Sequence, residues 1–144
     1  MTEGPTLRRA TAADAPACAK IVRDWLGSID WMPDPPAMEV IEQTMREGFP
    51  RREAYVAERN DTVLGYVSLD PDSDHIRGLY VAAPGDGVGK ALVDRVKEGR
   101  DRLTLNTHLP NADAHRFYAR EGFEKRGEET GGDGIPEYRM EWTR

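Results

Sequence analysis

The stretch at residues 79–93 limits the possible folds more than any other, because a strand, a glycine-rich turn and a helix follow one another in it without interruption. Its first three residues are apolar or aromatic and predict a buried strand, whereas Val88, Leu92 and Val96 recur at helical spacing. Glycines at positions 85, 87 and 89 lie between the two. Such a turn admits left-handed backbone angles and lets a ligand approach the main chain. Unpaired N–H groups at the start of the helix favour an anion such as phosphate.

Two familiar phosphate-binding turns do not fit this stretch. A nucleotide P-loop requires Gly-x-x-x-x-Gly-Lys-Ser/Thr, and Gly89 with Lys90 matches only its end. Pro84 replaces its first glycine, and Ala91 replaces its hydroxyl residue. A dinucleotide-binding turn requires Gly-x-Gly-x-x-Gly, whereas the spacing here is Gly-x-Gly-x-Gly. The pyrophosphate loop of an acyl-CoA enzyme and a glycine-rich turn without a ligand both stay open.

Length and composition limit the class of protein. We expect one domain over residues 1–144, because 144 residues can bury one core and are too few for two comfortable ones. Charged residues make up 32% and hydrophobic residues 38%, as in soluble globular proteins. No apolar run approaches the ~20 residues of a membrane span, and residues 1–5 lack signal-peptide character. We therefore expect a cytoplasmic protein that does not associate with membranes.

Cysteine content and net charge exclude further classes. Cys18 is the single cysteine, so an internal disulfide and a cysteine-based zinc site are excluded, and we expect no metal. Cys18 shares an apolar helix face with Ile21 and Val22, which favours a core residue over a nucleophile. A net charge of −6 argues against nonspecific nucleic-acid binding and slightly favours a cationic substrate over an anionic one.

The predicted elements follow in the order strand, two helices, three strands, helix, strand, helix and two strands. Asn60 and Asp61 predict a hairpin turn, Asn111 predicts a helix N-cap, and Gly122 predicts a left-handed C-terminal cap. The expected strands cover residues 6–9, 52–59, 62–69, 75–81, 103–106, 123–126 and 137–142. The expected helices run from about 11 to 27, 36 to 47, 88 to 99 and 112 to 120. We expect residues 127–136 to form a polar, mobile loop.

This order and three stretches resemble the GNAT family, the Gcn5-related N-acetyltransferases. The most specific stretch is Asn111-Ala-Asp-Ala-His-Arg-Phe-Tyr-Ala-Arg-Glu-Gly-Phe, which matches the family's Asn-x-x-Ala-x-x-Phe-Tyr-x-x-x-Gly-Phe at every fixed position. Gly87 and Gly89 match the end of its acetyl-CoA signature, Gln/Arg-x-x-Gly-x-Gly/Ala. Residues 55–58 and 63–67 are similar to its second and third strands. The signature's Gln/Arg position falls on Pro84, and the loop before Gly87 is about two residues shorter than the common form.

The resemblance implies an α/β (α+β) fold. Its mixed, mostly antiparallel sheet has about six or seven strands flanked by about four helices, and acetyl-CoA is the cosubstrate. The pantetheine arm lies where the strand before the glycine loop separates from the strand after the helix. The backbone of the first strand contacts this arm, the loop amides hold the pyrophosphate, and Asn111 touches the arm. The implied cofactor residues are Leu79, Tyr80, Val81, Gly85, Gly87, Val88, Gly89, Lys90 and Asn111.

The resemblance also implies catalytic and acceptor residues. Tyr118 corresponds to the acid that protonates the leaving thiolate, with packing as its alternative role. Counting four residues back from Leu79 places His75 where histone-acetylating members carry a glutamate base, and histidine titrates near neutrality. Asp74, Asp70 and Glu58 are alternatives that would act through water, whereas His115 is expected to be solvated and His108 has no distinguishing context. The acceptor pocket would be bordered by Trp25, Asp30, Trp31 and Met32.

Three functions remain for comparison. The first is acetyl-CoA-dependent transfer of an acetyl group to a primary amine of a small molecule or peptide by direct attack. The second is a noncatalytic acyl-CoA-binding or protein-interaction module with the same fold, which Pro84 supports. The third is an unrelated α/β nucleotide-binding domain. A homodimer is plausible, while the sequence does not identify the acceptor amine.

Overall fold

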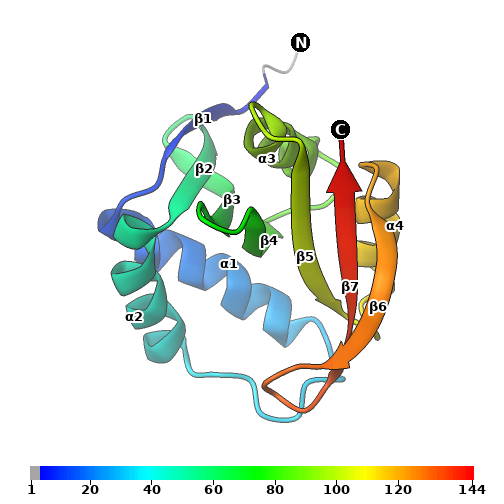
Figure 1. Ribbon diagram of the computed structural model, residues 1–144. Coiled ribbons are helices and arrows are strands. Elements are labelled where there is room, and N and C mark those ends of the chain that lie inside the picture. Colours follow the sequence, from blue (N-terminus) through cyan, green and yellow to red (C-terminus); the bar gives the residue numbers. More distant parts are fainter. Residues whose placement is uncertain (1–3) are drawn as a thin grey trace.

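The computed structural model of the protein describes residues 4–144, which form one seven-stranded sheet with helices on both faces (Figure 1). Residues 1–3, part of the segment expected to have no signal-peptide character, lie outside the described residues. The strands are β1 (Thr6–Arg9), β2 (Glu53–Arg59), β3 (Thr62–Asp70), β4 (His75–Val81), β5 (Arg102–His108), β6 (Glu124–Thr130) and β7 (Pro136–Thr143). The helices are α1 (Ala15–Gly27), α2 (Met38–Gly48), α3 (Val88–Lys97) and α4 (Ala112–Arg120), with 3-10 turns at Ala12–Asp14 and Phe49–Arg51.

The sheet is mixed and mostly antiparallel, as the resemblance implied. Its strand order is β1-β2-β3-β4-β5-β7-β6, and only the pair β4–β5 is parallel. A parallel pair requires a crossover, and α3 supplies it between β4 and β5. The fold class and the element order expected from the sequence are confirmed.

Each face of the sheet carries its own apolar core. Helices α3 and α4 pack on one face, where Leu69, Leu92 and Leu105 are fully or almost fully buried. Helices α1 and α2 cover the opposite face of the β1–β4 half only, over Val56 and Tyr66 (Figure 1). Alternate residues of the strands supply the two cores, as strand geometry requires. Among the described residues, no helix is both long and apolar enough to cross a bilayer.

The predicted local signals have the expected geometry. Asn60 and Asp61 take φ angles of 52° and 64°, which is the left-handed pair that a tight β2–β3 hairpin needs. The Asn111 side chain accepts a hydrogen bond from the Ala114 N–H, and Gly122, which follows the C-cap residue of α4, has φ 94°. Cys18 is fully buried in the α1–α2 core, and burial raises the pKa of its thiol to about 12. Its expected core role is confirmed.

Two predicted boundaries were wrong. Residues 127–136 are not one loop, because β6 continues to Thr130 and pairs with β7 up to Thr130–Pro136, which leaves only residues 131–135 in the turn. β6 is an edge strand with almost every side chain exposed, so no apolar alternation marks it in the sequence. α2 begins at Met38 instead of residue 36, after an extended Ala37.

Candidate active site

Strands β4 and β5 separate after two residue pairs, and the candidate site is built around the resulting gap. His75 pairs with Thr104 and Ile76 with Leu105, and no further pair joins the two strands. The rest of β4, up to Val81, pairs only with β3 on its other side. The separation that the resemblance implied is therefore present.

Backbone groups of Leu79 and Val81 point into this gap. The Ala82 N–H donates to the Leu64 oxygen of β3 at 2.8 Å. In an antiparallel pair, alternate residues direct their N–H and C=O groups toward the partner strand. Tyr80 therefore points its backbone groups to β3, whereas those of Leu79 and Val81 face the side from which β5 has moved away.

The glycine-rich turn leads from β4 into the N-terminus of α3. Gly85 and Gly87 have φ angles of 83° and 75°, and Gly87 is the N-cap residue of the helix. The first backbone bond of α3 runs from Ala91 N to Gly87 O, so the preceding N–H groups of residues 88–90 have no acceptor within the helix. These donors and the helix dipole make an anion-binding end.

Gly89 has a different role from the one its spacing suggested. It is helical and does not have a positive φ. A Cβ atom there would lie 3.1 Å from the Phe117 ring, so the small residue allows α3 and α4 to pack closely. This contact fixes the turn relative to the helix that carries Tyr118.

Charged side chains surround the turn. Asp86, within it, pairs with Arg59 at 3.1 Å, and Lys90 pairs with Asp94 and Glu121 at 3.3 and 3.4 Å. The Lys90 side chain remains 63% exposed, so its ammonium group can exchange these partners for a phosphate. Pro84 has no N–H to donate.

Tyr118 is buried against the gap. Its ring makes edge contacts with Phe117 and Phe123, at centroid distances of 5.3 and 5.5 Å. Burial, and secondarily the nearby Tyr80 hydroxyl, raises the pKa of Tyr118 above its ordinary value. The phenol therefore keeps its proton at neutral pH and can donate a hydrogen bond.

His75 lies at the closed end of the gap and is half-buried. Its Nδ1 is 2.8 Å from Thr104 Oγ1. Burial, and secondarily the Arg77 charge, lowers the pKa of His75, so its ring is neutral at pH 7. The three alternative bases are all ion-paired: Asp70 with Arg77, Asp74 with Arg100 and Glu58 with Arg8.

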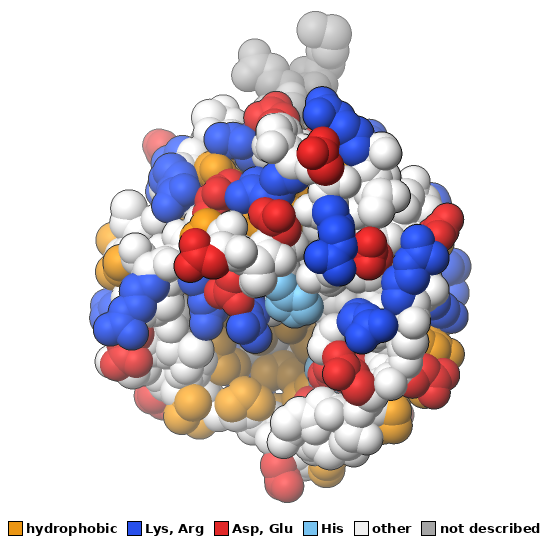
Figure 2. Space-filling view, viewed as in Figure 1, with side chains coloured by type: hydrophobic (Ala, Val, Ile, Leu, Met, Phe, Trp, Pro, Cys, Tyr) orange, Lys and Arg blue, Asp and Glu red, His pale blue; other side chains and the backbone are white. Residues whose placement is uncertain are grey.

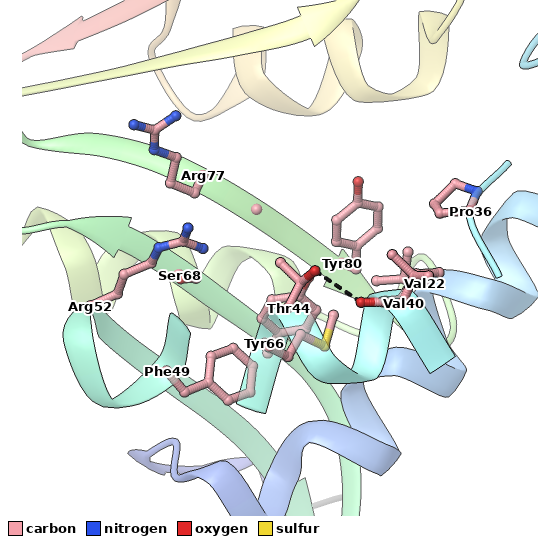
Figure 3. A pocket seen from close by; sticks show the side chains of 13 residues that line it. Val22, Pro36, Val40, Thr44, Phe49, Arg52, Tyr66, Ser68, Arg77 and Tyr80 are labelled. Carbon is pink, nitrogen blue, oxygen red and sulfur yellow. Dashed lines mark hydrogen bonds between the residues drawn. The ribbon is translucent and has the colours of Figure 1, made fainter. Parts of the chain in front are cut away.

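A cavity of about 270 Å³ opens on the α1–α2 face beside β4 (Figure 3). Figure 2 shows a hollow on this side of the molecule with hydrophobic side chains at its floor. Gly78 and Tyr80 of β4 line the cavity, while the neighbouring Leu79 faces the other core. The cavity therefore borders the gap along β4. Its other lining residues are Val22, Pro36, Val40, Ile41, Thr44, Met45, Phe49, Arg52, Tyr66, Ser68 and Arg77.

None of the four residues predicted to border the acceptor site, Trp25, Asp30, Trp31 and Met32, lines this cavity. Trp25 contacts Tyr80 and Trp31 at centroid distances of 5.3 and 5.7 Å, and Trp31 lies 5.1 Å from His108. Met32 packs against the α1–α2 core. Asp30 is exposed. The aromatic residues thus form a wall from α1 across the loop 28–37 to β5.

Two histidines have contacts that the sequence did not reveal. His108 Nε2 lies 2.8 Å from Asp133 and 3.6 Å from Glu137, and among the described residues these three side chains are the one group close enough to hold a metal ion. His115 was expected to be solvated, but it is partly buried, bonds the His108 backbone oxygen and contacts the Tyr138 ring.

Sequence reasoning also missed Arg52, Ser68 and Arg77 of the cavity. Arg77 is the extra residue of a β-bulge, since Ser68 pairs with Gly78 and Leu69 with Ile76. The bulge breaks the alternation of β4. A charged residue between Ile76 and the apolar end of the strand, residues 78–81, was the available signal.

The chain matches known acetyltransferases in sequence and in structure. Residues 35–144 match the family model described as the acetyltransferase (GNAT) domain. A segment of 67 residues, 45% of this chain, is 39% identical to 5-NmdU N-acetyltransferase of Pseudomonas phage PaMx11 and spans 47% of that protein, about half its length. Aminoalkylphosphonate N-acetyltransferase of Salmonella typhimurium is 28% identical over 140 residues, covering 83% of this chain and 84% of that enzyme.

A solved structure has the same fold. yncA of Salmonella typhimurium, solved with acetyl-CoA as its cofactor, superposes with a TM-score of 0.70 at 20% identity, covering 98% of this chain and 94% of that chain. The family model covers well over half of the sequence, and the separated strands with the glycine-capped helix agree with it. The chain therefore belongs to the GNAT family of acetyltransferases.

Proposed function

We propose that the protein transfers the acetyl group of acetyl-CoA to the primary amine of a small molecule. The observation that carries this proposal is the gap between β4 and β5, which the N-terminus of α3 and the buried Tyr118 adjoin. A cavity of about 270 Å³ suits a small acceptor better than a peptide chain. The names of the two curated relatives, both N-acetyltransferases, agree with an amine acceptor.

In this proposal the gap holds the pantetheine arm. The outward-facing backbone groups of Leu79 and Val81 bond its amides, and two N–H donors of the Asn111 side chain are available to it as well. Amides of the turn and of the first turn of α3 hold the pyrophosphate, with Lys90 adding positive charge. The residues that hold the pyrophosphate are Gly85, Gly87, Val88, Gly89 and Lys90, while the Tyr80 side chain lines the cavity beside the arm.

The acceptor nitrogen attacks the thioester carbonyl carbon, and the C–S bond breaks as the new C–N bond forms. Backbone N–H groups of β4 stabilise the oxyanion that develops on the carbonyl. His75, which is neutral at pH 7, accepts the proton that the nitrogen loses. Since His75 does not line the cavity, a water molecule relays this proton. The wall that Trp25 and Trp31 form closes the acceptor side.

Tyr118 stabilises the departing sulfur. Because its pKa is raised, complete proton transfer to a thiolate is uphill, since an ordinary thiol has a pKa of about 8.5. We therefore assign Tyr118 a hydrogen bond to the developing thiolate, and solvent protonates the thiolate as CoA leaves. This role does not require a tyrosinate to form.

A ligand-binding assay followed by a turnover assay tests the function. Acetyl-CoA is expected to raise the melting temperature of the protein, whereas ATP and NAD are not. Free thiol is then expected to appear when primary amines are added. Stabilisation by acetyl-CoA without thiol release from any amine would favour the noncatalytic module, and stabilisation by ATP or NAD alone would favour a nucleotide-binding domain.

The buried, unpaired Cys18 fits a reducing compartment, and we place this activity in the cytoplasm.

A further inference from the structure

The cavity beside β4 has two chemically different ends. Figure 3 shows the guanidinium groups of Arg52 and Arg77 at one end, near Ser68, and Tyr80, Val22 and Pro36 toward the other. Among the described residues that line it, two are arginines and none is Asp or Glu. A cavity of this composition is suited to a small molecule with one anionic end.

The two arginines are only partly neutralised. Both contact one carboxylate, that of Asp70, with Arg77 Nε at 2.5 Å and Arg52 Nε at 3.8 Å. The two guanidinium groups and one carboxylate leave a net charge of +1 at this end. The contact between Arg52 and Asp70 is at the distance limit of an ion pair. Most of the Arg52 N–H donors therefore remain available to a ligand.

Ser68 supplies an independent observation. The residue is 2% exposed, and its Oγ is the one buried side-chain polar atom in the described part of the chain that has no hydrogen-bond partner in the protein. An unpaired buried hydroxyl costs free energy, which a ligand that accepts its hydrogen bond recovers. Ser68 lines the same end of the cavity as the arginines, so it offers an oxygen-bearing anion a third donor.

The backbone is shaped to present these groups. The bulge at Arg77 places two consecutive β4 residues, Arg77 and Gly78, at the cavity. A Cβ on Gly78 would lie 3.3 Å from the Tyr66 hydroxyl, so glycine keeps the space beside that ring open. Thr44 lines the cavity as well, with its hydroxyl proton donated to Val40 O at 2.9 Å (Figure 3).

We propose that the acceptor is a small amine with a carboxylate or phosphonate group at its far end, held by Arg52, Arg77 and Ser68. This inference rests on the proposed acetyl transfer, because the amine end must reach the gap that the cavity borders at Gly78 and Tyr80. The local charge of the cavity overrides the net charge of −6, which by itself favours a cationic substrate.

A panel of amines of matched length tests the charge preference. The far end is neutral in butylamine, anionic in 4-aminobutyrate and 3-aminopropylphosphonate, and cationic in putrescine. With saturating acetyl-CoA, kcat/KM measured by thiol release is expected to be at least about tenfold higher for an anionic amine than for butylamine, and lowest for putrescine. The ratio of the two anionic amines distinguishes carboxylate from phosphonate.

Variants locate the preference. Arg52→Gln with Arg77→Gln is expected to reduce the ratio of kcat/KM for an anionic amine to kcat/KM for butylamine about tenfold or more, and Ser68→Ala to reduce that ratio less. Arg23→Gln, on the exposed side of α1, is the matched control and keeps the preference. Acetyl-CoA stabilisation of each variant shows that it is folded.

The outcomes separate the two proposals. Thiol release that is equal for all four amines, or an anionic preference that survives the double substitution, overturns the inference and leaves acetyl transfer intact. Stabilisation by acetyl-CoA without any thiol release overturns the transfer. In that case a further rise in melting temperature with 4-aminobutyrate in the presence of CoA, absent with butylamine, still supports the anion site, and no such rise overturns it.

Discussion

The Tyr118 hydroxyl can be removed with little change in packing, because its ring is held by Phe117 and Phe123. Tyr118→Phe is expected to lower kcat by about 10²-fold, since removing one hydrogen-bond donor from a developing negative charge costs about that much or more. The affinity for acetyl-CoA should stay within a few-fold of the original value. Steady-state kinetics with a titration of acetyl-CoA checks both. Unchanged turnover would mean that Tyr118 serves packing alone.

His75 should be visible in the pH profile. Because its pKa is lowered from 6.5, His75 is neutral above that pH and becomes protonated only in more acidic solution. Log kcat/KM is expected to rise with pH as the amine loses its proton, with a slope that doubles below the pKa of His75. His75→Gln keeps a partner for Thr104 and should remove the doubling. If the steeper region persists in the variant, another group is the base.

The turn before α3 and the turn after it each contain a glycine with a left-handed backbone, so they can be compared directly. Gly87 and Gly99 both have φ 75° and open space where a Cβ would be. Alanine at either position is expected to destabilise the protein by about 1 kcal/mol, because an L-residue is strained in this conformation. Only Gly87→Ala should also weaken acetyl-CoA binding, which chemical unfolding and calorimetric titration measure. Equal affinity in the two variants would argue against phosphate binding at this turn.

The elements differ in how far the sequence predicts them. The hairpin at Asn60 and the helix start at Asn111 depend on local backbone chemistry, and both were predicted correctly. The cofactor residues were proposed from two continuous stretches, and their roles stay predictions. The cavity was not predicted, because Arg52, Ser68 and Arg77 come from three separate segments of the chain. Arg77 also lies in a bulge that breaks the alternation of β4. Pairing that breaks the strand period leaves no regular pattern in the sequence.

For the whole molecule, the important feature is the weak connection between the two parts of the sheet. β1–β4 and β5–β7–β6 are joined by two residue pairs, and α1 and α2 cover only the first part. A cofactor between β4 and β5 would replace the missing pairs. At a concentration 100 times its Kd, a ligand that binds only the folded state adds about 2.7 kcal/mol to stability. A ligand in this gap would therefore add cohesion where few residue pairs join the sheet.

The central claim is that the acetyl group passes from acetyl-CoA to an amine, and the direct measurement is the stoichiometry of the two products. The purified protein is incubated with acetyl-CoA and 4-aminobutyrate, and free CoA and acetylated amine are both quantified by mass spectrometry. We predict equal amounts of the two products, strongly reduced in Tyr118→Phe. Free CoA without acetylated amine, or neither product from any amine of the panel, would contradict the account.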